Sequence, residues 1–291
     1  MVAPEDGSGR TDVLSYLRVD RFPHLWCPGC GHGIVLGALV RAIMRLELDP
    51  RRVVVVSGIG CAARAAGYLN FDGVHTTHGR AIAFASGIKL ARPELEVIVI
   101  TGDGDLAAIG GNHFVHACRR NMGITVVCFN NSIYGMTSGQ YSPMTPYHAM
   151  ATTAPYGHIE RPFDLCALAA GCGATYVARG AAYFPARLAD YIAGGLRHKG
   201  FAFIEAVTQC PTYFGRRNKM PRGVDLLRWQ KERAVPVERA ARMTPEELEG
   251  KFTVGVFRDA EELEYTEEYD RIIALAGYRE GGESGCPAPG R

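Results

Sequence analysis

The chain has 291 residues, of which 47% are hydrophobic and 21% are charged, and its formal net charge is +2. A chain of this length and apolar content can bury a large core, so we expect one main domain with a tail, or at most two domains. The near-neutral charge gives no support for a nucleic-acid partner. No segment resembles a signal peptide, and no apolar run approaches the roughly 18 residues of a membrane span. We therefore expect a cytoplasmic protein with no membrane partner.

Short apolar runs alternate with helical patterns through the first two thirds of the chain. These runs are uninterrupted and rich in β-branched residues, as expected for strands that are buried on both faces of a parallel sheet. The expected elements, in chain order, are a helix at 33–46, a strand at 53–56, a helix at 62–69, a strand at 74–77, a helix at 79–91, a strand at 97–100, a crossover helix at 107–120, a strand at 124–129, a helix at 163–170, a strand at 174–177, a helix at 185–196 and a strand at 201–207. The alternation predicts an α/β fold in which a parallel sheet lies between two layers of helices.

The two ends of the chain differ in character from this central part. We expect an N-terminal arm at 1–20, the α/β domain at 21–220, and a C-terminal arm with a flexible tail at 221–291. The C-terminal arm is charged and carries two short helical patterns, at 224–234 and 244–251. Its last residues are rich in Gly and Pro, which is typical of disordered segments.

A Gly-Asp-Gly sequence stands at Gly102-Asp103-Gly104, after one predicted strand, and Asn131 closes the next strand. Open α/β sheets place their ligands at the carboxyl ends of parallel strands. An acid and an amide oxygen at this edge can hold Mg²⁺, which favours oxygen ligands and often bridges the phosphates of a substrate or cofactor. A lone Gly-Asp-Gly is also a common turn, but its position between these two strands favours a metal–diphosphate site.

This segment resembles the diphosphate-binding motif of thiamin diphosphate enzymes. The resemblance implies that Asp103, the side chain of Asn131 and the backbone carbonyl of Ile133 bind Mg²⁺. The cofactor-binding residues expected on the same basis and from neighbouring loops are Ile59, Gly60, Cys61, His78, Gly79, Gly102, Asp103, Gly104, Asp105 and Asn131.

Two of these residues keep an alternative interpretation. His78 and Gly79 stand where a helix begins, and helix N-termini favour anions such as diphosphate, but His78 could equally be structural. Asp105 could hydrogen-bond backbone or water on the phosphate side, or it could be the N-cap of the crossover helix.

Four of the nine cysteines stand beside Gly or Pro in loops or at strand ends. Cys27 and Cys30 form a CxxC pair, whereas Cys61 and Cys210 are single and distant. Four thiolates can bind a structural zinc ion or a [4Fe–4S] cluster. Zinc sites usually contain two CxxC pairs, and Cys-Pro at the last position favours a cluster. A thioredoxin-like redox CxxC is the alternative, and it leaves Cys61 and Cys210 unexplained.

From about Phe22 to Asn218, the chain resembles the β subunit of the 2-oxoacid:ferredoxin oxidoreductases. The matching blocks, in order, are WCPGCGHG, SGIGC, HTTHGRAIAFASGIKLARP, GDGDLAAIGGNH, NNSIYGMTSGQYSPMTP and TQCPTYFGRRN. Among these enzymes the chain is most similar to the two-subunit 2-oxoglutarate:ferredoxin oxidoreductases, because it contains one set of cluster cysteines and no added ferredoxin-like cysteine runs.

The resemblance implies oxidative decarboxylation of 2-oxoglutarate with coenzyme A to succinyl-CoA and CO₂, and it leaves open the reverse, CO₂-fixing direction. Electrons would pass from thiamin diphosphate, through a [4Fe–4S] cluster on the four cysteines, to ferredoxin. An α subunit would supply the activating glutamate, the coenzyme A region and most substrate-binding residues, because no second α/β domain is recognisable. Pyruvate or a branched-chain 2-oxoacid as substrate stays open, as does a non-catalytic iron–sulfur scaffold.

Some charged residues near the cysteines have less specific roles. Arg216, Arg217 and Lys219 form either a docking patch for an acidic ferredoxin, through electrostatic steering, or an ordinary solvated surface. His24 and His32, on either side of the CxxC pair, are expected to be structural.

Overall fold

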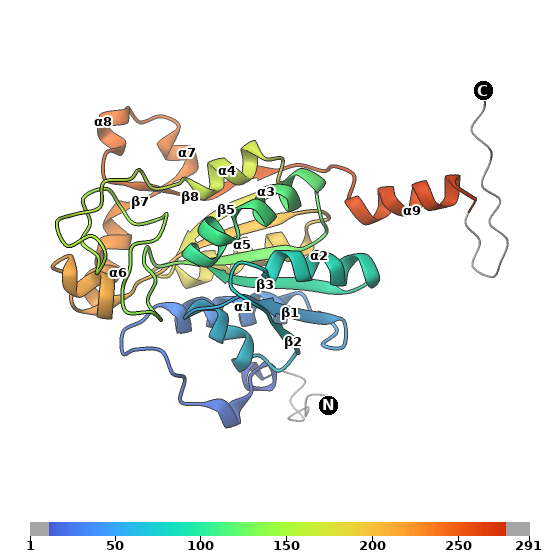
Figure 1. Ribbon diagram of the computed structural model, residues 1–291, viewed down its shortest axis with the longest axis horizontal. Helices are drawn as coiled ribbons and strands as arrows, with labels where there is room; N and C mark the ends of the chain where they lie inside the picture. The colour runs from blue at the N-terminus through green and yellow to red at the C-terminus, as the bar shows by residue number, and fades with distance from the viewer. Residues whose placement is uncertain (1–11, 278–291) are drawn as a thin grey trace.

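The computed structural model describes residues 12–277, which form a central sheet with helices on both faces (Figure 1). The sheet has eight strands in the order β2-β1-β3-β4-β6-β5-β8-β7. The strand bounds are β1 Val53–Ser57, β2 Asp72–His75, β3 Glu96–Gly102, β4 Thr125–Asn130, β5 Tyr176–Ala181, β6 Ala202–Val207, β7 Ala234–Pro236 and β8 Phe252–Asp259. Neighbouring strands are parallel except β5 and β8, which are antiparallel. The α/β fold with helices on both faces is therefore confirmed.

Alternate residues of each central strand enter two separate cores. In β3, Ile98 and Ile100 pack toward helices α1 and α5, whereas Val97 and Val99 pack toward α2, α3 and α4. The bounds of these helices are α1 His32–Arg45, α2 Ala81–Ala91, α3 Gly111–Arg120, α4 Leu165–Gly171 and α5 Pro185–Arg197. Burial on both faces explains why the central strands are continuous apolar runs.

Two predicted α-helices differ in the structure: one is a 3₁₀ segment, and the other begins with a π-helical turn. The predicted helix at 62–69 is a 3₁₀ segment, η3 Ala62–Tyr68. The predicted crossover helix is divided into a π-helical turn, η4 Asp105–Ile109, and α3. π-Helical turns occur frequently at functional sites, and η4 directly follows the Gly-Asp-Gly sequence.

Of the C-terminal elements, the sequence predicted the regions of α6 Gly223–Arg233 and α8 Pro245–Leu248. It predicted neither α7 Val237–Ala240 nor α9 Tyr265–Leu275, nor the two strands. Strand β8, however, joins the main sheet beside β5, and β7 pairs with it. Only two of the eight residues of β8 are buried, so this strand lacks the apolar run that marks the central strands.

The ends of the described region lie apart from the sheet's centre. Two 3₁₀ turns, η1 Val13–Tyr16 and η2 Val19–Arg21, contact η3 through a hydrogen bond from the Arg18 amide to the Tyr68 carbonyl. The last helix, α9 Tyr265–Leu275, extends away from the sheet (Figure 1). The predicted flexible tail falls almost wholly outside the described residues. No helix within residues 12–277 is long and apolar enough to cross a membrane.

Candidate functional site

A cavity of about 170 Å³ lies where the loops after β1, β3 and β4 meet. These strands are adjacent and parallel, so their carboxyl ends open onto one edge of the sheet. The predicted site residues that line this cavity are Ile59, Gly60, Cys61, His78, Gly102, Asp103, Gly104, Asp105, Asn131 and Ile133. The structure thus gathers residues that stand more than seventy positions apart in the sequence.

Asp103 is one of two buried acids that line this cavity, with 2% of its surface exposed. Burial raises the pKa of its carboxyl group to about 7, although the hydroxyl of Ser142 and the backbone amides of Asn131 and Gly104 act in the opposite direction. No Lys, Arg or His within residues 12–277 forms an ion pair with it. A cation at this position would restore the ionised form, so the carboxylate fits the chemistry of a metal ligand.

The turn after β4 completes the predicted metal-binding set. The Asn131 side chain is buried, and its Oδ1 accepts a hydrogen bond from the Ile133 amide at 3.3 Å. The Tyr134 hydroxyl donates to the Gly104 carbonyl at 3.1 Å. A Cβ atom on Gly104 would lie 2.2 Å from the Tyr134 ring, so the second glycine of Gly-Asp-Gly is required by this close approach.

Asp105 joins the neighbouring loops to the end of β3. Its Oδ1 accepts hydrogen bonds from the Gly79 amide at 2.7 Å and from the Ile59 amide at 3.3 Å, and it contacts His78 Nδ1 at 2.6 Å. Its Oδ2 accepts from the Thr101 hydroxyl at 2.8 Å. The side chain caps neither η4 nor α3. The N-cap alternative is therefore not what the structure contains; Asp105 instead fixes two loops that border the cavity.

The four predicted cluster cysteines come together beside this cavity. Burial and the nearby thiols of Cys210, Cys61 and Cys27 raise the pKa of Cys30 to about 12. Burial, Cys210 and Cys27 likewise raise the pKa of Cys61 to about 11. The sulfurs of Cys61 and Cys210 lie 3.3 Å and 4.0 Å from the position that a Cβ on Gly135 would take. All four are free thiols.

Hydrogen bonds between distant loops hold the cysteine segments in place. The Trp26 indole donates to the Cys61 carbonyl at 2.8 Å, and the Gly31 amide donates to the Gln209 carbonyl at 3.1 Å. Within residues 12–277, no group of three or more His, Cys, Asp or Glu side chains is already placed to hold a metal ion.

Comparison with curated proteins decides the family. The chain is 55% identical over 261 residues to the 2-oxoglutarate synthase subunit KorB of Methanocaldococcus jannaschii, which covers 90% of this chain and 97% of the relative. It is 52% identical to the subunit of the same name from Methanothermobacter marburgensis, over 92% of this chain and 93% of the relative. The chain belongs to the β subunits of the 2-oxoacid:ferredoxin oxidoreductases.

Two further comparisons agree with this family. The family described as "Thiamine pyrophosphate enzyme, C-terminal TPP binding domain" matches residues 55–206. Among solved structures, the fold matches a 2-oxoglutarate:ferredoxin oxidoreductase from Magnetococcus marinus with 2-oxoglutarate, coenzyme A and succinyl-CoA bound. The TM-score is 0.85 at 32% identity, over 97% of each chain.

The β-subunit cavity also contains residues that the sequence reading did not assign to it. His32 lines the cavity, and its buried Nδ1 has no hydrogen-bond partner within the described region. Burial lowers the pKa of His32 to about 3, so the imidazole is neutral. It also packs edge-on against Trp26 and Phe129, in keeping with the structural role expected of it. A bound group would give the orphaned nitrogen a partner.

Other missed residues come from the long connection at 132–161, which follows β4. Residues 134–137 line the cavity, and Ser142 donates its hydroxyl hydrogen bond to Asp103. The length of this segment indicates a functional loop, because long loops without secondary structure are often functional, but it does not single out individual residues. Arg216, Arg217 and Lys219 are exposed or partly exposed just beyond the π-helical turn η5 Pro211–Gly215.

Proposed function

We propose that this chain is the catalytic β subunit of a 2-oxoglutarate:ferredoxin oxidoreductase. The reaction converts 2-oxoglutarate and coenzyme A to succinyl-CoA and CO₂, with release of one proton and transfer of two electrons to ferredoxin. The observation that carries the proposal is the sheet edge itself. There, the buried carboxylate of Asp103, which forms no ion pair with any residue of 12–277, lies next to the four cysteine thiols. Cys61 both lines the cavity and belongs to the thiol group.

The donor set at the end of β3 and β4 fits a magnesium ion that carries a diphosphate. Asp103, the Asn131 side chain and the Ile133 carbonyl would bind Mg²⁺, which uses oxygen ligands and few protein groups. Thiamin diphosphate, when bound, supplies the electron sink that decarboxylation of a 2-oxoacid requires. Asp105 would keep the His78-Gly79 loop against the diphosphate side through its hydrogen bond from the Gly79 amide.

For the four thiols we favour a [4Fe–4S] cluster over a zinc ion, because the sequence has only one CxxC pair among them and a Cys-Pro at the last position. Cys27, Cys30, Cys61 and Cys210 would each bind a different iron of the cluster. The raised thiol pKa values of Cys30 and Cys61 indicate that positive charge is needed to keep these sulfurs ionised. Such a cluster supplies a one-electron acceptor beside the cofactor cavity.

The exposure of the cysteines suggests where electrons leave the protein. Cys27 is exposed, whereas Cys210 is buried, so one side of the cluster would face the surface. Ferredoxin is the partner that we propose for this side. The free thiols are compatible with a reducing compartment, so we propose a cytoplasmic location.

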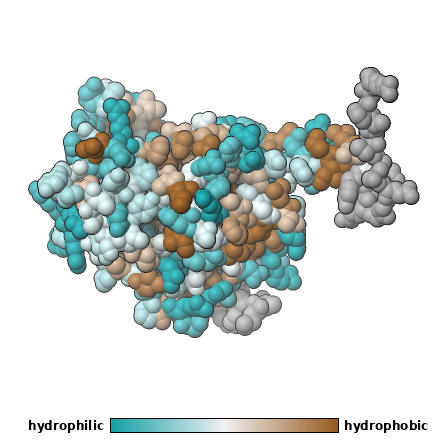
Figure 2. All heavy atoms as spheres, in the orientation of Figure 1, coloured by the Kyte–Doolittle hydropathy of each residue, from teal (hydrophilic) through white to brown (hydrophobic). Residues whose placement is uncertain are grey.

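The cavity mouth suggests that the site is completed by another chain. Ile59 and Met136 line the cavity, yet 40% and 47% of their surfaces are exposed. Phe84 and Leu90 on α2 are also 51% and 45% exposed, and Figure 2 shows hydrophobic residues gathered over this part of the molecule. An α subunit that contributes the activating glutamate, together with coenzyme A and substrate contacts, would cover this surface.

The test is coenzyme A-dependent reduction of a viologen dye under anaerobic conditions, with the chain co-expressed with its α partner. We expect 2-oxoglutarate to be strongly preferred over pyruvate and a branched-chain 2-oxoacid. Preference for another acid would replace the substrate and keep the reaction. No activity with any acid, despite full iron and bound thiamin diphosphate, would contradict the proposal.

A further inference from the structure

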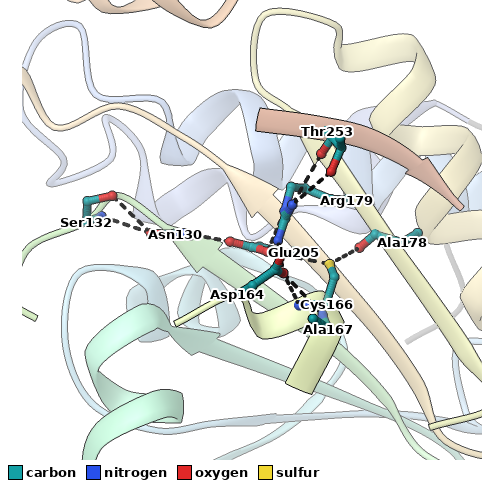
Figure 3. A network of polar contacts seen from close by, with 9 residues as sticks. All are labelled: Asn130, Ser132, Asp164, Cys166, Ala167, Ala178, Arg179, Glu205 and Thr253. Carbon is teal, nitrogen blue, oxygen red and sulfur yellow. Dashed lines mark hydrogen bonds and ion pairs between the residues drawn. The ribbon is translucent and has the colours of Figure 1, made fainter. Parts of the chain in front are cut away.

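A buried polar network lies directly behind the turn that carries Asn131 (Figure 3). Its centre is Glu205 on β6, which is 1% exposed. One carboxylate oxygen accepts a hydrogen bond from Asn130 Nδ2 at 2.6 Å, and the other accepts from Arg179 Nε at 2.7 Å. The network thus links β4, β6 and β5 across the interior of the sheet.

Asn130 connects Glu205 to the turn after β4 through the two atoms of its side-chain amide. Its Oδ1 accepts hydrogen bonds from the Ser132 amide at 3.0 Å and from the Ser132 hydroxyl at 3.4 Å. Ser132 has a φ of 60°, in the left-handed region that a serine seldom adopts. A second bond, from the Thr145 hydroxyl to the Ser132 carbonyl at 2.7 Å, holds the turn from the other side. Asn131 therefore stands between two residues whose positions are fixed.

The far end of the network ties Arg179 to other elements. Its Nη2 donates to Asp164 Oδ1 at 2.6 Å, just before α4, and its Nη1 lies 3.4 Å from the Thr253 carbonyl and hydroxyl on β8. The guanidinium is thereby fixed on three sides. Its orientation in turn fixes the Glu205 carboxylate that faces Asn130.

Stability alone does not account for ionised groups at this position. Burying a charge pair costs several kcal/mol per ion, and replacing such pairs with apolar residues is often neutral or stabilising. The residues on either side of Glu205 in β6, Ile204 and Ala206, are apolar and fully buried. The Glu205–Arg179 pair can hold the side-chain amide of Asn130 in one orientation, and apolar residues could not do so.

We propose that Glu205 is a positioning residue of the metal site and acts through Asn130. By holding the Asn130 amide it sets the direction of the Asn131 side chain and of the Ile133 carbonyl. The inference rests on the proposed function only in requiring that a divalent cation binds at Asp103 and Asn131. Outer-shell partners of this kind typically change metal affinity by about 10- to 100-fold when they are removed.

The test is a double-mutant cycle on the α–β complex after removal of metal and cofactor with a chelator. The Mg²⁺ concentration needed for half-maximal thiamin diphosphate binding is measured by calorimetry. Asn130→Ala should raise it about tenfold or more, because Ser132 and Glu205 both lose their partner. Glu205→Gln should raise it less, since an amide can still accept one hydrogen bond. In the Asn130→Ala background, Glu205→Gln should add less than about twofold.

Asp164→Asn is the matched control, because it removes a charge at the outer end of the network but keeps a side-chain oxygen that can accept the hydrogen bond from Arg179 Nη2. It should change the Mg²⁺ requirement by less than about twofold, since the path to the turn stays intact. Mn²⁺ in place of Mg²⁺ gives a second measurement: its EPR line shape should broaden in Asn130→Ala and stay unchanged in Asp164→Asn. A change in line shape reports ligand geometry, which a general loss of stability would not alter.

Several outcomes would overturn the inference. Wild-type Mg²⁺ affinity in Asn130→Ala would do so, even if Glu205→Gln failed to fold, because Asn130→Ala keeps the Glu205–Arg179 pair. Fully additive effects in the double variant would show that Glu205 affects Mg²⁺ binding independently of Asn130. Wild-type protein that binds no divalent cation with thiamin diphosphate would instead overturn the proposed function, so the two failures are distinguishable.

Discussion

The predicted metal site and the cysteine group share one edge of the sheet, yet they are built differently. Asp103 and Asn131 follow adjacent strands whose register is fixed by pairing, with Gly102 opposite Phe129. Both side chains are buried and hydrogen-bonded. The four cysteines instead come from loops far apart in the sequence, and one of them is exposed.

The difference suggests that strand pairing orders the predicted metal site, whereas the cysteine group also needs a bound group to order it. The residues of the predicted metal site stand at the ends of two paired strands, so we expect its geometry to persist without a ligand. The cysteine group depends on loop–loop contacts, such as the hydrogen bond from Gly31 to Gln209. The proposed cluster would give its four thiols a common partner. The two sites should therefore be separable by mutation.

The largest effect is expected from Asp103→Ala. Loss of the buried carboxylate should abolish thiamin diphosphate binding and turnover, because Asp103 is the one charged ligand in the proposed Mg²⁺ site. The iron content and the visible absorption of the cluster should stay at wild-type levels. Calorimetry and iron analysis check the two parts, and retained activity would show that Asp103 is not a metal ligand.

Cys210→Ser tests the other site. The variant should lose or destabilise the cluster, and with it the reduction of ferredoxin, while thiamin diphosphate still binds. Cys172→Ser is the matched control, because Cys172 is a partly exposed free thiol outside the group, and it should keep its iron. Full iron content in Cys210→Ser would show that the ligand assignment is wrong.

Gly104→Ala should produce an intermediate effect. The added Cβ would lie 2.2 Å from the Tyr134 ring, and overpacking of this kind typically costs about 1–3 kcal/mol. Weaker thiamin diphosphate binding should accompany the loss of stability. Gly87→Ala is the control: its Cβ would meet nothing within 4 Å, and in a helix interior it should stabilise the protein by up to about 1 kcal/mol. Urea unfolding compares the two, and equal effects would contradict the close approach.

The smallest effect is expected from Asp164→Asn on the pH dependence of stability. Burial favours a higher pKa for Asp164, but Arg179 and the amides of Ala167 and Cys166 outweigh it and hold the pKa below its usual value of 3.8. A lowered folded-state pKa stabilises the protein above the usual pKa, and this contribution disappears as the pH falls through the folded pKa. The wild-type advantage in urea midpoint should shrink from pH 6 to pH 3. An advantage that grows on acidification would contradict the assignment.

The sequence predicted features that depend on local patterns. Continuous β-branched runs marked the central strands, and Asp103 and Asn131 could be placed at one edge because parallel strands end on the same side. Strand β8 escaped because most of its residues are half-buried or exposed at the side of the sheet. A strand that is not buried on both faces does not need a continuous apolar run, so its sequence lacks the pattern that marked the central strands.

Polar contacts between distant segments escaped for a different reason. Ser142 binds Asp103 across 39 positions, and Glu205 binds Asn130 across 75. Neither pair has a local signature, because serine, asparagine and glutamate are common in loops and on surfaces. For Asp105 the sequence left two roles open, backbone hydrogen bonding and an N-cap, because the donors that decide between them come from the ends of β1, β2 and β3.

The most direct test of the account is EPR of the anaerobic α–β complex, frozen after mixing with 2-oxoglutarate. This measurement tests whether electrons pass from the thiamin diphosphate site to the cluster on the four cysteines. We predict the signal of a reduced [4Fe–4S] cluster in the wild type, and no such signal in Asp103→Ala despite its full iron content. Equal cluster reduction in both proteins would contradict the account, as would its absence from wild-type protein with full iron and bound thiamin diphosphate.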